Sequence, residues 1–201
     1  APYETITDEV YWIGSRDAWN QLDKGDVSDF NNEFTDASWP FITEGRYMAD
    51  KAVTLLLGFD AAGTLVNRLD LARAYLYAGL VRVVIGETFS DFVISDKTQT
   101  NPPIGENNMT ILFDQAVTSL NSGFTIAQTG TAAANLDLQR KILGVRARAQ
   151  HSKAVRQLLI PAKVTPANPY VTVAGATADA TAMLAVTGTP ADYKWKIDYF
   201  S

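Results

Sequence analysis

The single histidine of this chain, His151, is the residue on which proton-transfer chemistry would have to depend. A Ser-His-Asp site places a histidine base beside a nucleophile, and many such hydrolases present the serine in a G-x-S-x-G turn. No G-x-S-x-G sequence is present, and His151 lies in the middle of a helical pattern. A surface or helix-packing role is therefore favoured for His151. The sequence predicts no catalytic residue and no enzymatic activity.

Acidic residues are the other candidates for chemistry. Asp8 and Glu9 are adjacent, so in a strand they would point to opposite faces, and an N-cap or salt-bridge role is favoured. Asp23, Asp26 and Asp29 are spaced loosely like a calcium loop, but the segment lacks the glycine position and terminal glutamate of an EF-hand. The chain has no cysteine, no Walker loop and no H-E-x-x-H motif. We therefore expect no metal site and no cofactor.

The charge balance argues against nucleic acid as a partner. The formal net charge is −5, whereas phosphate binding depends on a basic face. One basic cluster stands out, but at 100° per residue its side chains scatter around a helix, which favours a solvated or ion-paired surface. Its members are Arg140, Lys141, Arg146, Arg148, Lys153 and Arg156. No apolar run approaches the roughly 18 residues of a membrane-spanning helix.

Aromatic residues near the N-terminus are the candidate ligand-binding residues. Tyr11, Trp12, Trp19 and Trp39 lie among Asp, Asn and Arg residues. Aromatic faces stack on sugar rings or contact peptides, and the polar neighbours supply directional hydrogen bonds. The alternative is that these rings fill gaps between helices. That alternative is favoured, because one sequence alone does not locate a ligand site.

The elements that would position these residues are helices. The strongest pattern lies in Leu65–Gly86, where apolar residues recur at steps of three and four along one helical face. A second apolar face, with several small residues, indicates a helix buried on more than one side. The first face holds Leu65, Leu69, Ala72, Leu76, Gly79 and Val83, and the second holds Leu71, Ala74, Tyr75 and Ala78.

A first helical hairpin is predicted over residues 36–86. Its first helix would begin with Asp36 or Ser38 as N-cap, with Pro40 in the first turn. Gly58 and the stretch 61–63 would break that helix, and the helix described above would return antiparallel to it.

A second hairpin is predicted over residues 106–159, after a loop that contains Pro102 and Pro103. Its first helix carries an apolar face made of Met109, Leu112, Phe113, Ala116, Val117, Leu120, Phe124 and Ala127. The returning helix, 136–159, carries two apolar stripes, which is typical of a helix between two layers in a stacked hairpin repeat. Two such hairpins favour a tetratricopeptide-like arrangement.

The two ends of the chain are less regular. Residues 1–35 are expected to be irregular, with a short helix over Ser15–Leu22. In residues 160–201, prolines favour an extended start, followed by a helix over Ala174–Val186. The alternation of aromatic and charged residues over Tyr193–Tyr199 predicts a half-buried strand. The fold class is thus mainly α, with antiparallel hairpins, irregular loops and little β-structure.

Several segments, taken in order, resemble the SusD/RagB-like family of outer-membrane nutrient-binding lipoproteins. The segment ARAYLYAGLVRVVIGETFSDFVIS (72–95) is similar to a family helix that ends in an aromatic–acidic turn. PPIGENNMTILFDQAVTSLNSGFTIAQ (102–128) looks like the family's loop and next helix, and NLDLQRKILGVRARAQHSKAV (135–155) like the helix after it. TDEVYWIGSRDAWNQLD (7–23) resembles the family's opening segment.

The resemblance implies a SusD-like α/α superhelix and a non-enzymatic protein at the outer-membrane cell surface. Such proteins capture oligosaccharides or peptides for a SusC-like TonB-dependent transporter. Residues 1–201 would form one helical domain of a longer protein. Membrane association would come only through a lipid anchor that this chain does not contain. The alternative function, from a different class, is a helical-repeat scaffold that binds another protein and takes no small ligand.

Overall fold

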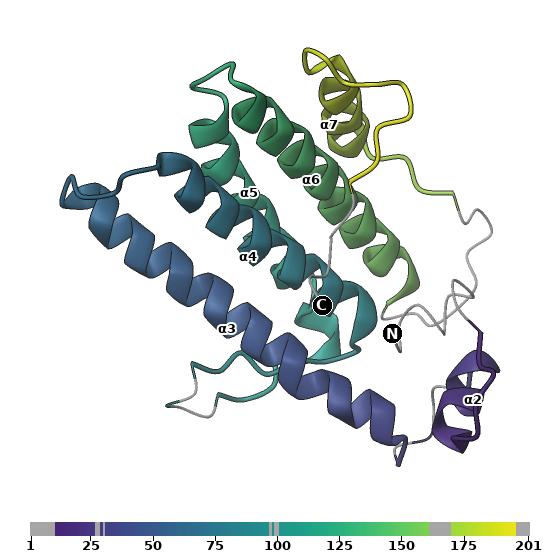
Figure 1. Cartoon of the computed structure of the whole chain (residues 1–201). Coiled ribbons are helices and arrows are strands. Elements are labelled where there is room, and N and C mark those ends of the chain that lie inside the picture. The colour runs from purple at the N-terminus through teal and green to yellow at the C-terminus, as the bar shows by residue number, and fades with distance from the viewer. Residues whose placement is uncertain are drawn as a thin grey trace. The chain divides into compact units, whose positions relative to one another are not determined.

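The computed structural model describes residues 11–26, 29, 31–96, 98, 101–160 and 170–195. Contacts group these residues into two units, Ala1–Arg46 and Tyr47–Ser201, and each unit is considered by itself. The described residues form helices, turns and loops and contain no strand (Figure 1). The predicted mainly α fold is confirmed. The single domain over residues 1–201 stays a prediction.

The first unit contains the short helix α2 (Asp17–Asp23) and the beginning of the long helix α3 (Glu33–Ala61). Asn32 is the residue that joins them. Its Oδ1 accepts a hydrogen bond from the N–H of Phe34, which caps α3, and its Nδ2 donates to the carbonyl of Ala18. The predicted helix over Ser15–Leu22 is present, with its bounds moved toward the C-terminus by one or two residues.

The predicted bounds of α3 are wrong at its start. Asn32 provides a cap before Asp36 or Ser38 is reached, so both of these residues lie inside the helix. Pro40 also lies inside α3 and not in its first turn. Gly58 does not break the helix, which continues to Ala61; Gly63, with φ of 70°, follows in the turn beyond it.

Helix α4 (Arg68–Thr88) begins three residues later than predicted, because Asn67 is its N-cap and accepts from the N–H of Leu69. It also runs two residues past the predicted end at Gly86. The turn between α3 and α4 is fixed by a two-pronged ion pair, in which the Arg68 guanidinium donates to both Asp60 oxygens at 2.9 Å.

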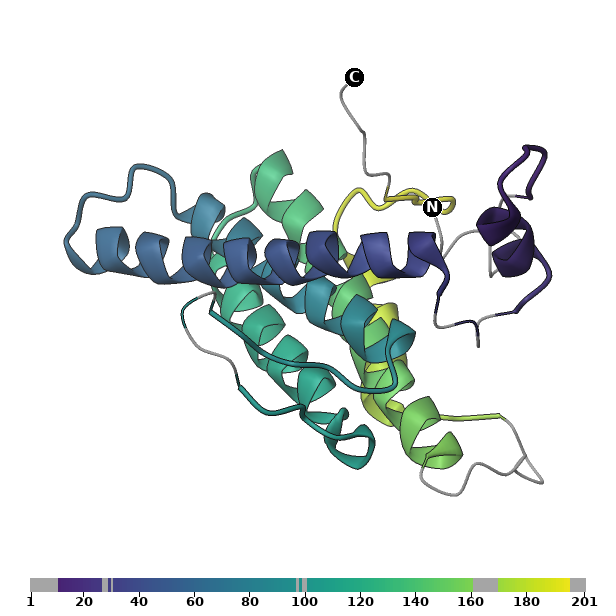
Figure 2. The same ribbon diagram turned by 90° about the horizontal axis from the view of Figure 1, so that it is seen from below.

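The second hairpin consists of α5 (Ile111–Ala127) and α6 (Ala133–Leu159), preceded by the single turn η1 (Glu106–Asn108). Helix α4 contacts both α5 and α6, and α7 (Ala174–Ala185) packs on α6. Figure 1 shows α4, α5 and α6 as neighbouring helices. Figure 2 shows the long loop that leads from the end of α4 to the start of α5. The prediction that the helix over 136–159 lies between two layers is confirmed.

The core of the second unit lies where α4, α5 and α6 meet. Leu76 of α4, Leu120 of α5 and Ile142 of α6 are all almost completely buried. A small residue of α4 allows a close approach to α5 here: a Cβ atom on Gly79 would lie 2.6 Å from Cγ of Leu120. The backbone of α4 therefore approaches the side chains of α5 more closely than any larger residue would permit.

The C-terminal part differs from the prediction in one respect. The helix over Ala174–Val186 is confirmed, ending one residue earlier. The strand over Tyr193–Tyr199 is wrong in its described part, because Tyr193–Trp195 is irregular. Here the aromatic side chains pack on α6 instead of pairing in a sheet, and Trp195 contacts the hydrophobic core. The remainder of that strand, the extended segment over 161–169 and residues 1–10 lie outside the described residues.

Candidate functional site

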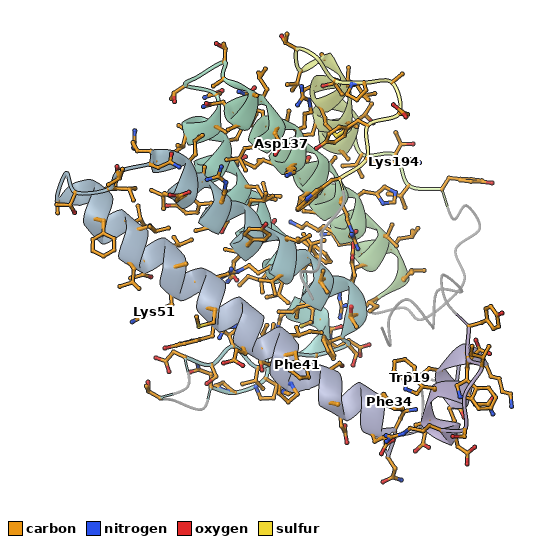
Figure 3. All side chains as sticks on the ribbon, in the orientation of Figure 1. Trp19, Phe34, Phe41, Lys51, Asp137 and Lys194 are labelled. Atoms are coloured by element: carbon orange, nitrogen blue, oxygen red, sulfur yellow. The ribbon has the colours of Figure 1, made fainter. Side chains whose placement is uncertain are left out.

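Trp19, one of the four predicted ligand-binding residues, belongs to a small aromatic cluster in the first unit. Its ring lies against that of Phe34, with 4.2 Å between the ring centroids and 35° between the planes. Figure 3 shows the two side chains facing each other across the junction of α2 and α3. The guanidinium of Arg16 lies 5.7 Å from the Phe34 centroid and forms an ion pair with Glu33 at 3.1 Å. The Trp19 ring is therefore half-buried and holds α2 against the start of α3.

Tyr11 and Trp12 occupy contrasting environments although they are adjacent. The side chain of Tyr11 is 78% exposed. Trp12 is half-buried, and its backbone N–H donates to Oδ1 of Asp23 at 3.1 Å. Its indole Nε1 is buried and has no hydrogen-bond partner in the described structure. Trp39, on α3, is half-buried.

The four predicted residues differ in how far their rings are available to a ligand. Trp19 is committed to Phe34, as the packing alternative expected. Tyr11 presents an open aromatic face and a phenolic hydroxyl, and this combination suits stacking on a sugar ring or contact with a peptide. The structure thus gives Tyr11 the strongest claim to a ligand contact among the four.

The aspartates that resemble a calcium loop are engaged in the local fold. Oδ1 of Asp23 accepts from Trp12, as described above. Asp29 accepts from Gln21 Nε2 at 2.8 Å and from the N–H of Asn31 at 2.9 Å. Within the described ranges, no group of three or more His, Asp or Glu side chains could hold a metal ion. Asp8 and Glu9 lie outside those ranges.

The aromatic–acidic turn after α4, which carries part of the family resemblance, closes the loop between α4 and α5. Oδ1 of Asp91 accepts from the N–H groups of both Phe92 and Gly105, each at 2.7 Å. The Phe92 ring is buried, and its carbonyl accepts from the N–H of Ile104 at 2.9 Å. One carboxylate therefore joins the two ends of a loop that are 14 residues apart in sequence.

Arg156 of α6 reinforces the same closure from the other side. Its guanidinium donates to the carbonyls of Gly86, Phe89, Ser90 and Glu106. Burial lowers the pKa of this guanidinium, and the nearby charges of Glu106 and Asp91 oppose that shift. Arg156 thus binds carbonyls at the end of α4 that have no partner within the helix.

The other members of the predicted basic cluster are mostly ion-paired, as predicted. Lys141 pairs with Asp137, Arg146 with Asp179, Arg148 with Glu87, and Lys153 with Asp114. The Arg146–Asp179 pair is the most buried of these and joins α6 to α7. Asn121 and Gln150 complete its hydrogen bonds. These cations serve the contacts between helices, and His151 between them is exposed on α6.

One arrangement was not foreseen from the sequence. Arg140 lies 5.8 Å from the ring centroid of Tyr193, and Lys141 lies 5.6 Å from that of Trp195. Burial raises the pKa of Tyr193, and the charge of Asp137 adds to the shift, while Lys141 and Arg140 oppose it. The signal was present as the alternation of aromatic residues at the C-terminus, which fits a segment lying on a helix as well as a strand.

Comparisons with protein-family models, with curated proteins and with solved structures found no match. In the described part of the chain, no helix has the length and apolar character needed to cross a membrane.

Proposed function

We propose that this protein is a non-enzymatic, cell-surface binding subunit of an outer-membrane nutrient importer, similar to SusD/RagB proteins. In this role it captures an oligosaccharide or a peptide and delivers it to a SusC-like TonB-dependent transporter. Its place at the outer membrane and its lipid anchor belong to the same proposal.

The observation that carries the proposal is the exposed ring of Tyr11, which precedes Trp12, a residue whose backbone N–H is bonded to Asp23 of α2. The rings of Trp19 and Phe34 lie against each other, with the Arg16 guanidinium 5.7 Å from the Phe34 centroid, and they hold α2 against the start of α3. An exposed aromatic ring on an ordered support loses little conformational freedom on binding. The proposal is also supported by the packing of α4, α5, α6 and α7 in the second unit, since the family resemblance implies a helical scaffold.

A titration of the full chain with a panel of oligosaccharides and peptides tests ligand capture. We expect saturable binding of at least one class by calorimetry, and we expect Tyr11→Ala to weaken it at least about tenfold, since a stacked ring contributes on the order of 1–3 kcal/mol. Tyr170→Ala is the matched control, because Tyr170 is an equally exposed tyrosine (86%) in the second unit. Binding that is equal in both variants would remove Tyr11 from the site.

The partner is tested separately. We expect a gene for a large TonB-dependent receptor beside the gene for this chain. When the two proteins are co-expressed, the detergent-solubilised receptor should co-purify with this chain. Co-purification without any ligand binding would favour a docking subunit over a capturing one, and failure of both would defeat the proposal.

A helical scaffold that binds another protein is the second candidate. It is favoured by the large apolar side chains exposed on α3, which include Met48, Leu55 and Phe59. Contiguous exposed apolar residues mark interaction surfaces. This candidate predicts no saturable binding of small ligands in the titration described above.

A further inference from the structure

The outward face of α3 in the second unit carries a regular apolar stripe. Met48, Ala52, Leu55 and Phe59 follow one another at steps of four, three and four, which is the spacing of a helix–helix seam. The side chains of Met48, Leu55 and Phe59 are 57%, 50% and 51% exposed. Asp50, on another face of the same helix, pairs with Arg82 of α4 at 2.7 Å. The stripe is therefore directed away from the core that the helix helps to cover.

We propose that this stripe is a self-association surface that pairs with the same stripe of a second copy, the two α3 helices running antiparallel. A two-fold axis midway between Ala52 and Leu55 places Met48 opposite Phe59 of the second copy, and Ala52 opposite Leu55 of the second copy. Each contact then occurs twice, as an isologous interface requires. The large leucine meets the small alanine, and the methionine sulfur meets an aromatic ring, which is a favourable pairing.

The residues beside the stripe fit the same register. Gly58 is exposed, and the space around its Cβ position is open to 4 Å. In the antiparallel pair, the exposed Lys51 of one copy lies beside Gly58 of the other, where no side chain obstructs it. Figure 3 shows Lys51 on the side of α3 directed away from α4.

Electrostatics favour this placement of Lys51. The last turn of α3 contains no basic residue of its own, and Arg68, whose guanidinium reaches this turn, is paired with the Asp60 carboxylate. Lys51 of the second copy supplies a cation at that end.

The size of the stripe sets the expected strength. Three half-exposed side chains contribute on the order of 300 Å² per copy, compared with about 800 Å² per partner in a standard stable complex. The pair is therefore a weak dimer, with a dissociation constant on the order of 10–1000 μM. Such a dimer dissociates in dilute solution and forms where many copies are held close together.

Sedimentation velocity of the full chain over roughly 5–500 μM tests the proposal across that affinity range. We expect a reversible monomer–dimer equilibrium that Leu55→Glu weakens at least about tenfold, because it buries a charge at the centre of the seam. Leu184→Glu is the matched control, an exposed leucine on α7 (59%) changed in the same way. Circular dichroism verifies that both variants keep their helices.

Three outcomes would overturn the proposal. These are a monomer at every concentration, a dimer that Leu55→Glu leaves intact, and a dimer that both variants abolish, which would indicate non-specific apolar association.

The register is tested by disulfide trapping, for which the absence of native cysteine gives a clean background. A mixture of Ala52→Cys and Leu55→Cys chains should cross-link faster than either variant alone, because the register brings these two positions together. Positions paired with themselves are offset by three residues, or about 4.5 Å along the helix. Equal rates in the mixture and in the single variants would rule out the antiparallel register.

Discussion

Gly86 of α4 lies directly against the ring of Phe113 of α5: a Cβ atom built on Gly86 would sit 2.6 Å from Cζ of that ring. Both residues are buried. The same relationship recurs seven residues earlier along α4 and seven residues later along α5, between Gly79 and Leu120. Two glycines on one face of α4 thus receive two large side chains of an antiparallel neighbour.

Gly86→Ala should destabilise the protein by about 1–3 kcal/mol, because a methyl group must displace a rigid ring in a close-packed core. Urea unfolding followed by circular dichroism measures the change. Gly45→Ala is the control, since Gly45 is an exposed helical glycine with no atom within 4 Å of its Cβ position. That change should stabilise α3 by about 0.5–1 kcal/mol through helix propensity. Equal effects of the two changes would contradict the packing of Gly86.

Arg156→Met should destabilise the protein by about 1.5–3 kcal/mol, because the guanidinium binds four carbonyls and a charged donor is costly to lose. Hydrogen exchange should also accelerate at the N–H groups of Phe92 and Gly105, which lie at the loop ends. Arg73→Met removes an exposed arginine paired with Asp70 and should change stability by less than about 0.5 kcal/mol. Unchanged exchange at the loop ends would show that Asp91 closes the loop without help from Arg156.

Asp179→Ala should cost about 3–5 kcal/mol, because it leaves the Arg146 guanidinium without its partner in a mostly buried site. The double variant Arg146→Met/Asp179→Leu should recover much of this loss, since it removes both charges. The control is Asp114→Ala, whose ion pair with Lys153 is exposed and whose cost should stay below about 1 kcal/mol. A double variant that is less stable than Asp179→Ala would argue that packing, and not charge, holds α7 on α6.

Tyr193 should make stability fall at high pH. Its folded-state pKa is raised by burial, above an unfolded value of about 10. A raised pKa gives stability that is fully present below the unfolded pKa and is lost as the pH rises through the folded one. Above about pH 10, Tyr193→Phe should therefore gain free energy of unfolding relative to the parent protein, compared with the difference between the two at pH 8, as measured by urea unfolding. Tyr170→Phe controls for the loss of one tyrosine, and a gain of the same size in that variant would contradict the assignment.

The core of the second unit could be predicted because its pattern is local. Leu76 and Leu120 lie at steps of three and four from other apolar residues, and helix geometry alone places such residues on one face. A contact of this type, between glycines of one helix and large side chains of another, could also be predicted, since small residues within an apolar face allow a neighbouring helix to approach closely. Which side chain of α5 packs against each glycine depends on how the two helices are aligned along their axes. Sequence periodicity does not specify that alignment.

The bounds of α3 could not be predicted, because several residues compete to be its N-cap. The aromatic contacts could not be predicted, because they join residues that are far apart in the sequence. Asn32, Asp36 and Ser38 are all good caps, and the contact of Asn32 with Ala18 decides among them. Trp19 meets Phe34 across 15 positions of the chain, a separation that helical periodicity does not specify. At the C-terminus, the alternation that suggested a strand instead lays Tyr193 on a neighbouring helix.

Asp91 and Arg156 fix only the two ends of the loop between α4 and α5, which form its base. The base, from Phe89 to Phe92 and from Ile104 to Glu106, is fastened to α6 and sets the approach of α5. Farther along the loop, the Asn101 side chain donates to the carbonyl of Ile94. A change made outside the base leaves the contacts of Asp91 and Arg156 in place. The loop is therefore a ready insertion point for a probe or a transplanted recognition peptide, held by a support that α6 keeps rigid.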